Sequence, residues 1–84
     1  LSRHSIEAYA RDLRHFLRAM DEAGRRRPGD VERSDVLAWL EAMEASGLAP
    51  SSRARTLSAV RGFFRHLVRE GRLEASPVRD LRPG

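Results

Sequence analysis

Apolar residues recur every three or four positions along much of the chain, which is the spacing of one face of an α-helix. Over residues 2–23 they form a single stripe, and Gly24 ends this segment before a Gly- and Pro-containing loop at 24–30. The pattern therefore predicts a first helix over residues 2–23. Its apolar stripe consists of Ile6, Tyr9, Ala10, Leu13, Phe16, Leu17 and Met20.

A second helical pattern covers roughly residues 33–46, and Gly47 closes it. The sequence is compatible with two N-cap residues for this helix. Either Ser34 caps it, or Glu32 occupies the cap position with Asp35 three residues further on. The apolar side of the predicted helix is formed by Val36, Leu37, Trp39, Leu40 and Met43.

The longest helical pattern begins near Pro50, a residue suited to the first helical position, and runs to about Glu70 before Gly71. The Ser-Pro pair at 76–77 resembles an N-cap followed by a first-turn proline, which predicts a short fourth helix through about Leu81. The sequence has no strand pattern. It predicts an all-α fold of three main helices and one short C-terminal helix.

With 84 residues, the chain fits one small domain spanning 1–84. It has no cysteine, which excludes disulfides and cysteine-ligated zinc. No apolar run approaches the ~20 residues of a membrane span, and no signal-peptide pattern is present, so a cytoplasmic location is expected. The expected core consists of Leu13, Phe16, Leu17, Trp39, Leu40, Leu57, Val60, Phe64 and Leu67.

The third predicted helix has a second face opposite its apolar side. Ser58 and Gly62 are small and leave a shallow trough between arginines. Glycine in a helix interior costs ~1 kcal/mol relative to alanine, so its use here is understandable if another backbone must come close. This face consists of Arg55, Ser58, Gly62, Arg65 and Arg69, with Arg61 on its flank.

The distribution of charge gives this second face a candidate function. The net charge is +4 and all 16 basic residues are arginine, whose planar fork binds two acceptors at once. No acid occurs between Ser51 and Arg69, whereas a face built for solubility usually mixes signs. A solvated arginine face remains the alternative. The polar face of the first predicted helix is also basic, but Glu7 and Asp12 reduce its positive charge. The second predicted helix carries the acids Asp35, Glu41 and Glu44.

Catalytic and metal-binding patterns are absent from the sequence. His4 and His15 have no third ligand at a suitable spacing, so no metal is expected. There is no Gly-rich phosphate loop and no nucleophile motif. Tyr9 is the only tyrosine, and its position on the apolar stripe predicts a core residue. No catalytic residue and no cofactor are therefore expected.

Four segments, in order, resemble the N-terminal core-binding domain of tyrosine recombinases, particularly the Xer type and related phage integrases. The similarity covers nearly the whole chain, and L-S-A-V-R-x-F-F is its most specific part. The segments are S-I-E-A-Y-A-R-D-L-R-H-F (5–16), D-V-L-A-W-L (35–40), S-S-R-A-R-T-L-S-A-V-R-G-F-F-R-H-L (51–67) and S-P-V-R-D-L (76–81).

The resemblance implies a SAM-like four-helix bundle that clamps duplex DNA together with a separate catalytic domain. The first and third helices would face the major groove, and Arg55 is the best candidate to reach a base edge. The partners implied are duplex DNA and other recombinase protomers. Including the flanking Arg61, the candidate DNA-binding residues are Ser5, Ala8, Arg11, Ser52, Arg55, Ser58, Arg61, Gly62 and Arg65.

In that family the catalytic Arg, Lys, His and Tyr residues belong to the other domain and have no match in this sequence. The chain alone is therefore not expected to cut DNA. The alternative from another functional class is a SAM-like helical protein-interaction domain whose basic and acidic faces pair head to tail. The pattern does not distinguish chromosome resolution from integration of mobile DNA.

Overall fold

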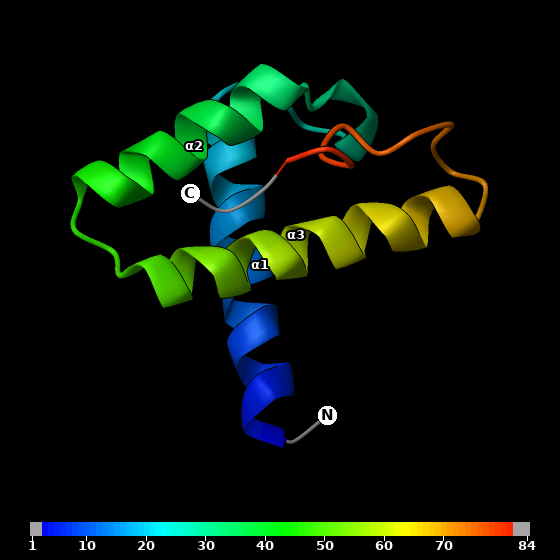
Figure 1. Cartoon of the computed structure of the whole chain (residues 1–84). Helices are drawn as coiled ribbons and strands as arrows, with labels where there is room; N and C mark the ends of the chain where they lie inside the picture. The colour runs from blue at the N-terminus through cyan, green and yellow to red at the C-terminus, as the bar shows by residue number, and fades with distance from the viewer. Residues whose placement is uncertain (1–2, 82–84) are drawn as a thin grey trace.

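The computed structural model describes residues 3–81, without the side chains of residues 4 and 5. The regular secondary structure of this part of the chain is all helical, with no strand, as the sequence predicted (Figure 1). The helices are α1 (Arg3–Glu22), α2 (Arg33–Ala45) and α3 (Pro50–Arg69), and a 3₁₀ turn, η1 (Pro28–Asp30), lies between the first two.

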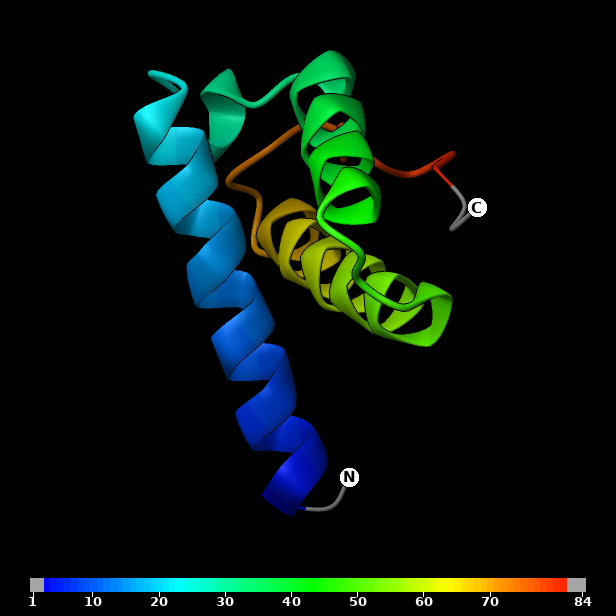
Figure 2. The same ribbon diagram turned by 90° about the vertical axis from the view of Figure 1, so that its left-hand side faces the viewer.

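The three helices do not run parallel to one another. α3 crosses α1 at a steep angle and makes most of the interhelical contacts with it, while α2 lies over the C-terminal half of α1 (Figure 1). The N-terminal half of α1 extends past α3, as the turned view shows (Figure 2). Residues 70–81 then return from the end of α3 toward α2 (Figure 1). This arrangement leaves one side of α3 outside the bundle.

The ends of the helices follow local signals in the sequence. Gly47 (φ 90°) and Gly71 (φ 74°) adopt the left-handed conformation that glycine tolerates best. Each helix end closes with the same pair of backbone bonds: for α3, the Gly71 N–H donates to the Val68 carbonyl and the Arg72 N–H to the Leu67 carbonyl. The predicted helix ends are therefore confirmed within a residue or two.

The open question about the start of α2 is resolved in favour of Glu32. Its backbone N–H donates to Oδ2 of Asp35 at 2.8 Å, which is one half of a capping box. α3 begins at Pro50 as predicted, and Ala49 supplies no side-chain cap. Nearby, Nη1 of Arg53 donates to the Leu48 carbonyl at 3.0 Å.

The predicted short fourth helix is not formed. Residues 77–80 form a turn, in which the Val78 N–H donates to Ser76 Oγ at 3.2 Å and the Leu81 N–H donates to the Val78 carbonyl at 3.1 Å. Val78 and Leu81 are both buried in the core. One turn is enough to bring both side chains inward, and so short a segment cannot offset the cost of nucleating a helix.

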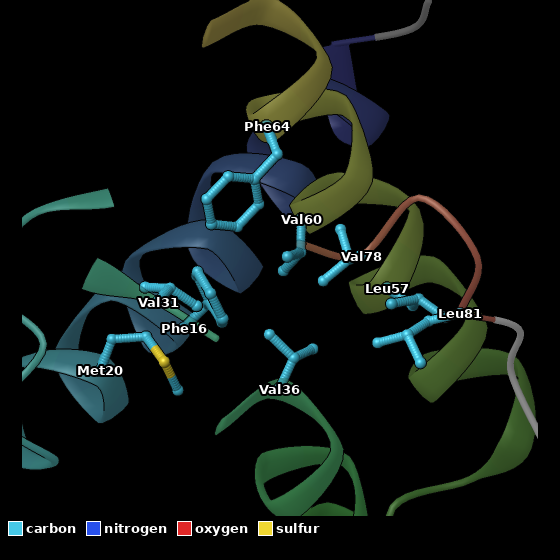
Figure 3. Packing of buried hydrophobic residues seen from close by; sticks show 9 residues of the cluster. All are labelled: Phe16, Met20, Val31, Val36, Leu57, Val60, Phe64, Val78 and Leu81. Atoms are coloured by element: carbon cyan, nitrogen blue, oxygen red, sulfur yellow. The ribbon is translucent and has the colours of Figure 1, made fainter. Parts of the chain in front are cut away.

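The core lies where α3 crosses α1, and α2 and the C-terminal segment close it with Val36, Val78 and Leu81 (Figure 3). Four of the predicted core residues are fully enclosed: Phe16, Leu57, Val60 and Phe64. Leu13, Trp39, Leu40 and Leu67 are partly buried and pack around them. The core also contains five residues outside the predicted set, namely Met20, Val31, Val36, Val78 and Leu81.

Two expectations for α1 were wrong. Leu17 is 40% exposed rather than part of the core, and Tyr9 is only half-buried. Leu17 lies along the chain between the buried residues Phe16 and Met20, but on the edge of the apolar stripe that faces away from them. Tyr9 lies in the N-terminal half of α1, and a steep crossing covers only a short length of a helix. Ile6, near the overhanging end, is 55% exposed for the same reason.

Candidate nucleic-acid interface

The outward face of α3 carries the small residues and arginines that the helical pattern placed there. Ser58, Gly62 and Arg65 are exposed, and Arg61 is half-buried on the flank. A Cβ built on Gly62 would meet no neighbouring atom within 4 Å. The trough between the arginines is therefore open to solvent and contributes nothing to internal packing.

The other candidate residues are less uniformly placed. On α1, Arg11 is exposed and Ala8 is half-buried. Ser5 belongs to the first turn of α1, but its side chain lies outside the described residues. Ser52, near the start of α3, is half-buried. The structure thus brings Ser58, Arg61, Gly62 and Arg65 together on one helix, whereas Ala8 and Arg11 lie on the crossing helix.

Arg55 is not a free arginine. Its Nε donates to Oδ2 of Asp12 at 2.8 Å and its Nη2 donates to Oδ1 at 3.2 Å, so the pair joins α3 to α1 in a bidentate arrangement. Asp12 is only 7% exposed. The hydrogen bonds from Arg55 to Asp12, followed by the attraction between their charges, raise the pKa of Arg55.

This pair corrects the view that Asp12 merely dilutes surface charge on α1. The absence of acids from α3 itself is real, but the partner of Arg55 comes from another helix. The sequence did contain a signal for it, because Asp12 lies three residues after Tyr9 and four before Phe16. An acid at that spacing lies within the apolar stripe and needs a partner when the stripe is buried.

We expect Arg55→Ala to lower the free energy of unfolding more than Arg65→Ala does. Removing Arg55 leaves the Asp12 carboxylate enclosed without its partner, whereas Arg65 is exposed and makes no ion pair with the described residues. Chemical denaturation of both variants measures the difference.

The matched control is the double variant Asp12→Ala with Arg55→Ala. A coupling between the two sites should make its loss of stability smaller than the sum of the single losses. Strict additivity of the two losses would contradict the role of the ion pair.

The acidic side of the molecule is smaller than predicted. Asp35 accepts the cap bond from Glu32, and its Oδ2 lies 3.0 Å from Nε of Arg25, so its charge is locally balanced. Glu41 and Glu44 are exposed and form no ion pair with residues 3–81. Of the three acids that the sequence assigned to a negative face of α2, only Glu41 and Glu44 therefore leave an unbalanced negative charge there.

Sequence reasoning missed one arginine beside this face. Arg79, in the segment after α3, lines a groove of about 400 Å³ together with Arg61 and Arg65. It follows the Ser-Pro pair, within the segment that the sequence predicts as a short fourth helix, and therefore apart from α3. No spacing rule connects positions 61, 65 and 79, and only the return of the chain brings them together.

Within residues 3–81, no three potential ligands among His, Cys, Asp and Glu lie close enough to hold a metal ion. In the same part of the chain, none of the helices is both long and apolar enough to cross a membrane.

A family model and two curated relatives all relate this chain to phage integrases and tyrosine recombinases. The model of the phage integrase N-terminal SAM-like domain matches residues 1–71. The chain is 37% identical over 79 residues to "Tyrosine recombinase XerD" of Listeria monocytogenes serotype 4b, and 36% identical over 83 residues to "Tyrosine recombinase XerC" of Pseudomonas savastanoi pv. phaseolicola. No solved structure gives a significant match.

These alignments cover 93% and 99% of the chain but only 27% and 28% of the two recombinases. The chain therefore spans about a quarter of the length of the curated relatives it matches. The family model, in contrast, covers most of the chain, and the residues it matches include all three helices of the structure. The chain belongs to the phage integrase N-terminal SAM-like domain family.

Proposed function

We propose that this chain is the DNA-binding module of a site-specific tyrosine recombinase. It holds one side of duplex DNA while a separate catalytic domain carries out strand exchange. The observation that carries the proposal is the outward face of α3, where Arg61, Arg65 and Arg69 have no carboxylate within 4 Å among residues 3–81. Membership of the integrase family supports the same conclusion.

The arginines on this face bind mainly phosphates, which fix the position of the protein on the duplex without reading its sequence. Gly62 helps because it lets the DNA backbone approach the helix closely. Ser58 adds a hydroxyl at the same trough, and Ser52 another near the start of α3. On α1, the same duplex meets Arg11, with Ala8 and Ser5 nearer the N-terminus of that helix.

Arg55 has a more limited role than an unpaired arginine. Two of its five N–H donors are used by Asp12, which leaves three for DNA. The bidentate pair also holds the guanidinium in one orientation. A fixed donor set is suited to recognising one base edge or one phosphate, so Arg55 remains a DNA contact in this proposal.

The chemistry of recombination is assigned to the other domain, and the partners of this module are duplex DNA and neighbouring recombinase protomers. The family's catalytic set of Arg, Lys, His and Tyr has no matching motif in this sequence, which contains no lysine and a single tyrosine, Tyr9. The chain alone should therefore form no covalent adduct when incubated with nicked or supercoiled DNA.

We expect Arg65→Ala to weaken duplex binding while changing the free energy of unfolding by no more than about 0.5 kcal/mol. If the lost contact is to a phosphate, affinity falls about equally on all sequences and the salt slope decreases by about one unit. Titration of duplex DNA at low and high salt measures both quantities.

Glu41→Ala is the control for this titration, since it removes a charge from α2 and should leave binding intact or slightly stronger.

The alternative function, a protein-interaction domain, is tested in the same samples. Duplex binding that weakens steeply with salt supports the DNA module, because bound cations are released from the duplex. Self-association in sedimentation without DNA, combined with no duplex binding, would instead show that the charged faces pair with each other.

A further inference from the structure

We infer that the groove between α3 and the C-terminal segment binds a phosphate of the DNA backbone, and that Arg79 completes this site. The inference rests on the proposed function and extends the DNA contact beyond α1 and α3. The groove has a volume of about 400 Å³. It is lined by Arg61, Arg65, Val68, Glu74, Ala75, Ser76 and Arg79.

The excess of positive charge around the groove favours the binding of an anion. Three arginines line it, two from α3 and one from the C-terminal segment, and Glu74 is the single acid in its lining. None of the three arginines has a carboxylate within 4 Å in the part of the chain that the structure describes. Their mutual repulsion is relieved when a negative group occupies the space between them.

The backbone that carries Arg79 is held firmly. Val78 on one side is fully buried between the helices, and Leu81 two residues later is 3% exposed (Figure 3). The Val78 N–H is bound by Ser76 Oγ at 3.2 Å. A side chain anchored in this way loses little additional backbone freedom when it binds a ligand, which favours binding.

The acid next to Arg79 does not neutralise it. Oδ1 of Asp80 accepts a hydrogen bond from Nε of Arg33 at 3.2 Å, on the side of α2. That hydrogen bond is the main cause that lowers the pKa of Asp80, and Asp80 forms its ion pair with Arg33 and none with Arg79. The carboxylate of Asp80 is therefore engaged by Arg33, and Arg79 keeps its charge available for the groove.

The side chains present match a phosphodiester oxygen better than a carbonyl or an apolar group. Arginine forks bind two oxygens of one phosphate in parallel. The Ser76 hydroxyl accepts from Val78 and still has its own hydrogen to donate. Because Arg61 and Arg65 also border the outward face of α3, a phosphate in the groove lies on a continuous path with the proposed duplex.

The test compares duplex affinity of the 84-residue chain at about 50 and 200 mM salt. One phosphate contact contributes about 0.9 to the slope of log affinity against log salt. Between these two salt concentrations, the fold-loss of affinity should therefore be about 3.5 times smaller for Arg79→Gln than for wild type. Arg72→Gln is the matched control. It makes the same charge change in the same segment, but Arg72 is exposed beside a different hollow, with Leu67 and Leu73.

A second variant tests the groove from the opposite direction. Glu74→Gln removes the single acid of the lining and should strengthen duplex binding, whereas a groove unconnected with DNA predicts no change. If wild type binds duplex with a salt-dependent slope but Arg79→Gln keeps that slope and Glu74→Gln leaves affinity unchanged, the groove is not a phosphate site and the proposed function stands. If wild type binds no duplex at low salt, the proposed function itself is wrong.

Discussion

Phe16→Ala is expected to lower the free energy of unfolding by about 3–5 kcal/mol. Phe16 is fully buried, and its ring meets Trp39 of α2 and Phe64 of α3 in edge-to-face arrangements with centroid separations of 5.1 and 5.9 Å. One side chain of α1 thus contacts both other helices. Its removal takes away the transfer energy of the ring and leaves a cavity at the crossing.

Leu17→Ala is the control for this variant. Leu17 is the next residue on α1, but it is 40% exposed, so its truncation should cost only about 1 kcal/mol. Phe16→Leu keeps the domain folded if the alanine variant does not fold, and its loss should fall between the two. Equal losses for Phe16→Ala and Leu17→Ala in chemical denaturation would contradict the packing described for α1.

Gly62→Glu is expected to reduce duplex affinity by at least about 100-fold, the largest effect on binding of any single change considered. It places bulk and a negative charge in the trough of α3, where the DNA backbone is proposed to lie, and like charges in contact cost several kcal/mol. The fold should survive, because Gly62 has an ordinary helical backbone and a Cβ there meets nothing within 4 Å.

Two control variants separate the causes of this loss. Gly62→Ala should raise the free energy of unfolding by about 0.5–1 kcal/mol, since alanine is the better helix former, and should weaken binding far less than glutamate does. Ala38→Glu makes the same change of charge on the exposed surface of α2. If Gly62→Glu binds duplex as well as Ala38→Glu does, the outward face of α3 is not part of the DNA interface.

Much of the fold was predictable because its signals are local. Helix periodicity depends on residues three or four apart, and each helix ends at a glycine that forms its own closing hydrogen bonds. The outward face of α3, with Ser58, Gly62 and Arg65, follows from the same periodicity, since one side of the helix is apolar. These features require no knowledge of where any other helix lies.

The sequence by itself therefore determined the three helices, their apolar sides and the acid-free face of α3. Only the tertiary structure decided how much of each apolar side is covered, which is why Leu17 is exposed and Val78 is buried. It also decided that Arg55 pairs with Asp12, 43 residues away in the chain, and that Arg79 lines the same groove as Arg61. Periodicity fixes the direction of a side chain on its own helix, whereas crossing angles and the path of the returning chain determine what that side chain meets.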